Sequence, residues 1–91
     1  MMKGIKMKTF RLIISSPDGN LFDDQAVCIS TRGAMGDFAV MAGHTPFITT
    51  VKAGECKIEL ENEEKVATTE GGILTVSKEN VTLLSSSFKW K

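Results

Sequence analysis

The sequence has only one histidine and two cysteines in 91 residues, which leaves little material for a metal centre or a nucleophile. The histidine, His44, and the two thiols, Cys28 and Cys56, lack the paired spacing that zinc sites use, so we predict no metal. His44 beside an aspartate could act as a general base, but no serine or cysteine lies in a nucleophile-elbow motif. We therefore favour a structural histidine over a small hydrolase, and two buried thiols over a disulfide.

The chain also lacks an excess of either charge and lacks a long hydrophobic run. Eleven basic residues balance eleven acidic ones, so no global field attracts nucleic acid or an anionic membrane. The longest apolar run, Phe38 to Ala42, is far shorter than the roughly 20 residues of a membrane-spanning helix. The basic start has no apolar stretch of the secretory type. We expect an intracellular protein that does not span a bilayer and has no nucleic-acid partner.

Two glycine motifs do not complete any known nucleotide-binding pattern. Gly33-Ala34-Met35-Gly36 has the spacing of a loop that clamps RNA backbone, but the helices and basic loop residues of that fold are missing. Gly71-Gly72 is followed neither by the lysine and hydroxyl residue of a phosphate-binding loop nor by a helix. We therefore predict no cofactor.

Alternating apolar and polar residues predict strands along nearly the whole chain. The expected strands lie near residues 10–14, 27–30, 57–61, 66–69, 73–76 and 81–84. The later ones recur at intervals of about 8–12 residues, which is typical of a sandwich or barrel. No stretch shows a sustained helical repeat with caps. With 42% hydrophobic and 24% charged residues, the composition is that of a globular protein, and we predict one all-β domain.

We place this domain at residues 8–86, with residues 1–7 and 87–91 as flexible or accessory ends. Its most specific segment runs from Gly33 to Pro46 and holds three of the eight glycines, the only histidine and one of the two prolines. Large, adaptable side chains in this segment are of the kind enriched in interfaces, so we predict a surface shaped to receive another protein. At the C-terminus, Phe88 and Trp90 are expected to be an exposed aromatic pair available for docking.

Three motifs occur in an order that matches a known family. They are Phe10-Arg11-Leu12-Ile13-Ile14-Ser15-Ser16-Pro17-Asp18, then Gly33-x-x-Gly36-Asp37-Phe38, then Gly43-His44-Thr45-Pro46-Phe47. Three later segments agree in order and spacing: Val51-Lys52-Ala53-Gly54, Gly71-Gly72-Ile73-Leu74-Thr75-Val76 and Asn80-Val81-Thr82-Leu83-Leu84. Over about residues 8–85 the chain resembles the epsilon subunit of the rotary F-type ATP synthase. It departs from that family at Ala39, where glycine is common, and at Ala42, where proline is usual.

The resemblance implies a roughly ten-stranded β-sandwich at the foot of the central stalk, between the gamma subunit and the membrane ring of c subunits. It implies a non-catalytic part that couples rotation driven by protons or sodium ions to ATP synthesis on other subunits. By residue matching, the c-ring interface would contain Met35, Gly36 and Asp37, and the gamma interface would contain Ser16, Met41 and His44. The Asp37 carboxylate could pair with a basic group of the ring. The protein would lie at the cytoplasmic face of the bacterial membrane, held there only through the complex.

Full-length members of that family continue into a C-terminal helical hairpin that can inhibit ATP hydrolysis and that binds ATP in some members. This sequence ends at Lys91 without such a segment, so we expect no helical hairpin, no nucleotide binding and no inhibition of that kind. The alternative is a free-standing β-sandwich that binds other proteins, which would have no affinity for stalk subunits.

Overall fold

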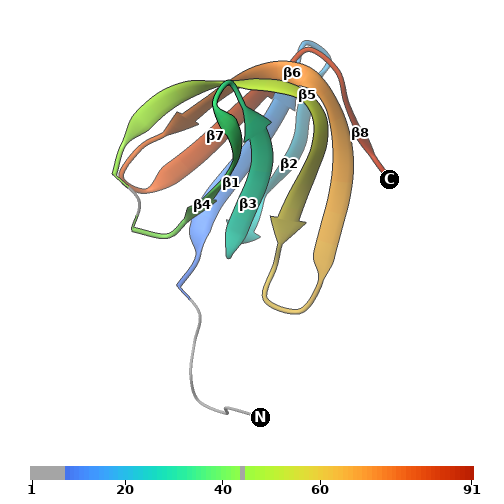
Figure 1. Ribbon diagram of the computed structural model, residues 1–91. Helices are drawn as coiled ribbons and strands as arrows, with labels where there is room; N and C mark the ends of the chain where they lie inside the picture. Colours follow the sequence, from blue (N-terminus) through green and yellow to red (C-terminus); the bar gives the residue numbers. More distant parts are fainter. Residues whose placement is uncertain (1–7, 44) are drawn as a thin grey trace.

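The computed structural model describes residues 8–43 and 45–91, and this part of the chain forms strands but no helix (Figure 1). The strands are β1 (Phe10–Ser16), β2 (Gly19–Ala26), β3 (Cys28–Gly33), β4 (Gly36–Met41), β5 (Phe47–Glu59), β6 (Glu64–Val76), β7 (Asn80–Ser85) and β8 (Phe88–Trp90). The all-β prediction is therefore confirmed. Among these residues there is no helix with the length and apolar character needed to cross a membrane.

The strands β5 and β6 are long, arch over one end of the molecule and take part in both of its layers (Figure 1). Residues 47–51 of β5 pair with residues 72–76 of β6, and these halves join β7, β1 and β2 in one layer. Residues 57–59 of β5 pair with β3, and residues 67–69 of β6 pair with β8, so the other halves complete the second layer with β4. The two layers are thus halves of one continuous sheet folded over a common core.

The described residues form eight strands, whereas the resemblance implied about ten. The difference arises at two glycines with positive φ, Gly54 (153°) in β5 and Gly71 (117°) in β6. A Cβ at Gly71 would lie 2.9 Å from the carbonyl oxygen of Val51, so a side chain would prevent the two strands from bending together so closely. Strand pairing resumes on both sides of the bend, so each long strand counts once. Counting the halves separately would restore the expected ten.

The hydrophobic core lies between the layers and draws side chains from most strands. Its largest fully buried members are Leu12, Ile14, Ile29, Val40, Cys56, Ile58, Leu74 and Leu83. They occupy alternate positions along their strands, as the period-2 pattern predicts. Burial raises the pKa of the Cys56 thiol to about 11, so this cysteine is a protonated, small hydrophobic residue of the core. Cys28 is half-buried, and both cysteines are free.

The C-terminal residues, which we placed outside the domain, are part of the fold. Strand β8 pairs with Ala67–Thr69 of β6, and the backbone N–H of Lys91 donates to the Val66 carbonyl at 2.9 Å. Phe88 is 9% exposed and belongs to the core, so the expectation of an exposed aromatic pair is wrong for this residue. Trp90 remains 39% exposed.

Two pairs of aromatic side chains connect strands of the two layers at places where these strands do not pair through their backbones. On one side, Trp90 of β8 meets Phe22 of β2 edge-on, with 5.8 Å between ring centroids. On the other, Phe38 of β4 meets Phe47 of β5 in the same way at 6.4 Å. Such edge-to-face pairs contribute about 0.5–1.5 kcal/mol beyond the area that they bury. They join strands that do not pair with each other through their backbones among the described residues.

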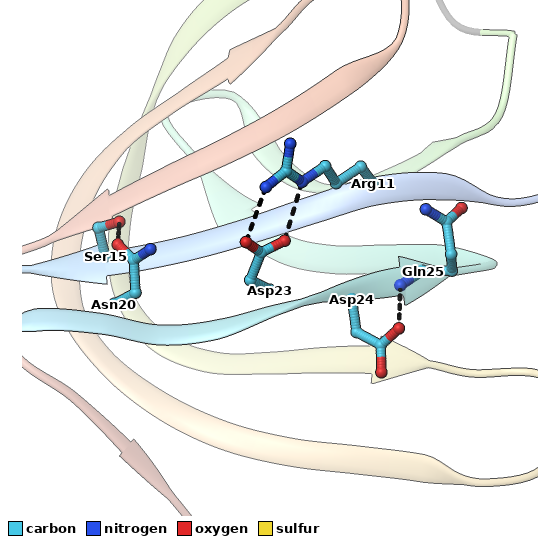
Figure 2. Close-up of polar contacts among 6 residues, drawn as sticks. All are labelled: Arg11, Ser15, Asn20, Asp23, Asp24 and Gln25. Atoms are coloured by element: carbon cyan, nitrogen blue, oxygen red, sulfur yellow. Dashed lines mark hydrogen bonds and ion pairs between the residues drawn. The ribbon is translucent and has the colours of Figure 1, made fainter.

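Polar contacts fix the β1–β2 hairpin on its exposed side (Figure 2). The Arg11 guanidinium donates two hydrogen bonds to the Asp23 carboxylate, from Nε to Oδ1 at 2.9 Å and from Nη2 to Oδ2 at 2.8 Å. Nearer the turn, the Ser15 hydroxyl donates to Asn20 Oδ1 at 2.7 Å. This contact lies where the register shifts between Ile14 and Ser15. A two-pronged arginine–carboxylate contact has a defined geometry that a single surface ion pair lacks.

We expect the Asp23 carboxyl to titrate below its ordinary pKa, first because it accepts hydrogen bonds from Arg11 and also because of the positive charge of that side chain. A carboxyl group whose pKa is lower in the folded state than in the unfolded state stabilises the fold at pH values above the unfolded-state pKa. This contribution is lost as the pH falls through the folded-state pKa. A carboxyl ¹³C NMR titration measures the value directly. In Arg11→Met the Asp23 pKa should return toward normal, and an unchanged pKa in that variant would show that another group depresses it.

Candidate functional site

The β3–β4 hairpin places the Gly33-x-x-Gly36 motif at an exposed tip. Gly33 and Gly36 are register partners, so Ala34 and Met35 form a two-residue turn. Gly36 has φ 120°, a value that a residue with a Cβ rarely adopts. A Cβ at Gly33 would lie 2.7 Å from Cε1 of Phe38, so the aromatic ring packs against the glycine backbone. The motif therefore builds a sharp turn that holds the Met35 side chain in solvent, at 101% exposure.

Directly behind this tip, Arg32 and Asp37 face each other across the two strands. Arg32 Nε lies 3.4 Å from Asp37 Oδ1, and the two side chains are 59% and 79% exposed. The pair borders a hollow of about 380 Å³ whose lining consists of Ser30, Thr31, Arg32, Asp37, Glu55 and Lys57. An exposed ion pair of this kind contributes about 0–1 kcal/mol, so it adds little to the stability of the fold. Asp37 thus already has a basic partner within its own chain.

Ser16 lies at the end of β1 and organises the next turn. Its hydroxyl accepts from the backbone N–H of Asp18 at 3.2 Å and lies 3.4 Å from the Gly19 carbonyl oxygen, to which it donates. Beside it is a largely apolar hollow of about 440 Å³ lined by Ser15, Ser16, Pro17, Gly72, Ile73, Leu84, Ser85 and Ser86. Ile73 and Leu84 are register partners on the outer face and are 45% and 50% exposed. Ser16 is therefore half-buried at the rim of an apolar depression.

Met41 ends β4 and is 57% exposed, whereas His44 lies outside the described residues. Met41 is the register partner of Cys28, at the end of the hairpin remote from the turn. Ser16 lies at the opposite end of the strands. A chain of register partners shows this. Ser15, next to Ser16, pairs with Leu84 of β7, and the following residue of β7, Ser85, pairs with Gly72 of β6. Gly72 pairs with Val51 of β5, which pairs with Gly33 at the β3–β4 turn. The structure therefore gathers Met35, Gly36 and Asp37 at one tip, but it does not bring Ser16 and Met41 together.

A comparison with protein-family models decides what this fold is. Residues 9–91 match the model described as "ATP synthase, Delta/Epsilon chain, beta-sandwich domain". The chain belongs to this family. The match includes every strand, β8 among them, and the family description agrees with the layered all-β architecture.

Individual relatives support the assignment. The chain is 36% identical over 84 residues to the sodium-ion-specific ATP synthase epsilon chain of Acetobacterium woodii, covering 91% of this chain and 63% of the relative. Among solved structures it superposes with a TM-score of 0.86 on a chain of the Euglena gracilis mitochondrial ATP synthase OSCP/F1/c-ring structure, at 19% identity, covering 99% of this chain and 58% of that one. For a Tetrahymena thermophila mitochondrial ATP synthase central stalk/c-ring structure, the TM-score is 0.78 at 11% identity, with 92% and 68% covered. The chain thus spans less than two thirds of the length of the curated relatives that it matches.

Sequence reasoning missed Arg32 as part of the tip. The sequence could have indicated it, because a two-residue turn between Gly33 and Gly36 places Arg32, the residue before Gly33, opposite Asp37, the residue after Gly36. It also missed the exposed apolar residues Ile73 and Leu84, which follow the same strand alternation as buried ones. Within residues 8–43 and 45–91, no three acidic, histidine or cysteine side chains gather closely enough to hold a metal ion.

Proposed function

We propose that this protein is the non-catalytic central-stalk subunit of an ion-translocating F-type ATP synthase. In this role it connects the gamma subunit to the membrane ring of c subunits and couples ion-driven rotation to ATP synthesis. The observation that carries the proposal is the match of residues 9–91 to the delta/epsilon β-sandwich family. The fold it shares with chains of F1/c-ring and central stalk/c-ring structures supports the same conclusion.

The architecture suits a part that transmits torque. A rotor element must not deform when its two ends are loaded, and β5 and β6 each continue through the bend from one layer into the other around one buried core. The two-residue turn directs the Met35 side chain outward, and Arg32 and Asp37 are in contact directly behind it. An outward projection of this kind can engage a neighbour by shape, which a surface ion pair of about 0–1 kcal/mol could not do alone.

The proposed partners follow from the matched residues. Met35, Gly36 and Asp37 at the tip would contact the c-ring. Met41, the last residue of β4, and His44, which lies outside the described residues, would contact gamma. Ser16 was matched to the gamma interface, but it lies at the same end of the strands as the β3–β4 turn. A gamma surface that contacts both ends must therefore extend along the molecule. The protein would associate with the cytoplasmic face of a bacterial membrane through the complex, with a proton or sodium ion as the coupling ion, and we propose no nucleotide or nucleic-acid ligand.

Binding to the gamma subunit of the same organism tests this proposal. We expect the two proteins to co-elute in size-exclusion chromatography and to bind tightly in calorimetric titrations. His44→Ala should weaken gamma binding, while Asp37→Ala should leave it unchanged because Asp37 lies at the tip assigned to the ring. Absence of association at tens of micromolar would contradict the rotor assignment and would favour the free-standing binding module.

A further inference from the structure

The turn of the β3–β4 hairpin has few backbone links to the rest of the molecule. Among the described residues, β4 pairs only with β3. The pairing of β3 with β5 is interrupted at Thr31 and Arg32 and resumes at a single register pair, Gly33 with Val51. Beyond the interruption, strand pairing therefore connects this end of the hairpin to β5 at one position. Side chains must determine how the turn is oriented on the core.

Glycine at position 33 makes room for a neighbouring side chain. Gly33 does not have a positive φ, so its backbone conformation is open to residues with a Cβ. A Cβ at this position would, however, lie 2.7 Å from Cε1 and 2.9 Å from Cδ1 of Phe38. Carbon atoms in van der Waals contact are about 3.5–4.0 Å apart. The space that a side chain of residue 33 would take is therefore occupied by the Phe38 ring.

The same ring also packs against the other layer. Phe38 is half-buried against the core, and its ring meets that of Phe47 edge-on, with 6.4 Å between the centroids. Phe47 is the first residue of β5 and pairs with Val76 of β6. One side chain therefore contacts the residue that begins the turn and, on another side, the end of a long strand in the other layer.

We propose that Phe38 is a positioning residue, which fixes the orientation of the Met35 turn relative to the core by packing between Gly33 and Phe47. The ion pair directly behind the tip cannot take this role, because both of its residues belong to the hairpin and are mostly exposed. The inference rests on the proposed function, in which the tip contacts another part of the rotor. Phe38 then transfers load from the tip to β5 and β6.

A double-mutant cycle tests the contact between Gly33 and Phe38. Gly33→Ala should destabilise the wild type, because the new methyl group meets the ring. Leucine has no atom at the place of Cε1, so in the Phe38→Leu background the same change should lower stability by about half as much or less. Urea unfolding followed by Trp90 fluorescence measures all four proteins. An equal loss in both backgrounds would overturn the contact and the proposal with it.

Amide hydrogen exchange distinguishes positioning from a general contribution to stability. Gly33 and Gly36 close the two-residue turn, and such a closing pair is hydrogen-bonded. In Phe38→Leu we expect the amides of these two glycines to exchange at least about tenfold faster than in the wild type, with a smaller acceleration at the buried Leu83. If the glycine amides accelerated no more than that of Leu83, Phe38 would have only a structural role and the proposal would be overturned.

Phe22→Leu is the matched control for this experiment. Phe22 is also half-buried against the core and makes an edge-to-face contact, with Trp90, but it lies in the other hairpin. Its replacement should therefore leave the exchange of the two turn glycines unchanged. Acceleration at the turn equal to that in Phe38→Leu would mean that any loss of aromatic packing loosens the tip, and it would contradict a specific role of Phe38.

The assembled synthase separates this inference from the stalk assignment. With the photoreactive residue p-benzoylphenylalanine in place of Met35, Phe38→Leu should incorporate like the unmodified sequence at position 38 but crosslink to the c-ring with a lower yield. Unchanged crosslinking in spite of a loosened turn would overturn the role of Phe38 in positioning the tip. Failure of the wild type to enter the synthase would contradict the stalk assignment and the transfer of load, whereas faster exchange at the turn in Phe38→Leu would still support the packing role.

Discussion

Replacing Gly72 with alanine is expected to lower the free energy of unfolding by about 3 kcal/mol or more, the upper end of the cost of overpacking, because the new methyl group has no space. A Cβ at this position would lie 2.0 Å from the Leu84 carbonyl oxygen and 2.9 Å from its carbonyl carbon. Both atoms belong to the backbone of β7, which pairs with β6 at Gly72 and Ser85. The neighbour cannot rotate away like a side chain, so the β6–β7 ladder must separate locally.

Gly19→Ala is the control for this prediction. Gly19 has φ 127°, but no atom lies within 4 Å of a Cβ built there. Its alanine variant therefore meets backbone strain of roughly 1–2 kcal/mol without a clash. Urea unfolding of both variants can be followed by the fluorescence of Trp90, the only tryptophan, which packs against Phe22 and Phe88. If Gly72→Ala lost no more stability than Gly19→Ala, the close approach of β6 and β7 would be wrong.

The second large effect is expected at Leu83, which is 0% exposed. It is the register partner of Ile14 in β1 and of Leu74 in β6, both also fully buried, so it lies at the centre of one layer's inner face. Leu83→Ala should lower the free energy of unfolding by about 2–5 kcal/mol through lost burial and a residual cavity. The same urea titration measures this change.

The next residue provides a matched comparison. Leu84 is 50% exposed on the outer face, because successive side chains of a strand point to opposite sides. Leu84→Ala should change the free energy of unfolding by less than about 1 kcal/mol. Equal losses at the two positions would mean that β7 does not have the inward and outward faces described. A specific loss of gamma binding in Leu84→Ala would instead mark the outer face as an interface.

Local pattern in the sequence was sufficient to predict β1, β3, β7 and parts of β5 and β6, but β2, β4 and the first half of β5 were not among the expected strands. Residues such as Leu12 and Ile14 alternate with polar neighbours, and this period depends only on the strand itself. The bends at Gly54 and Gly71 were not predicted, because a bent strand and two separate strands have the same local pattern. Strand β8 was missed because three residues are too few to show a period. Its place is set by pairing with β6, which lies about twenty residues away in the sequence.

The candidate site was predictable where it depends on neighbouring residues. The tip at Met35 follows from two glycines that bracket a two-residue turn, and the structure places it in solvent. Ser16 and Met41 were matched to one interface, but their positions depend on the register of several strands that are distant in sequence. That register places them at opposite ends of the strands. No local pattern could have shown this separation.

The central claim is that one small domain contacts two different partners at different places. Photo-crosslinking in the assembled synthase tests it directly, with the photoreactive residue p-benzoylphenylalanine introduced at Met35 in one variant and at Met41 in another. The account predicts that position 35 crosslinks to a c subunit and that position 41 crosslinks to gamma. Incorporation into the synthase with both positions crosslinking to the same subunit, or with no crosslink to either partner, would contradict it.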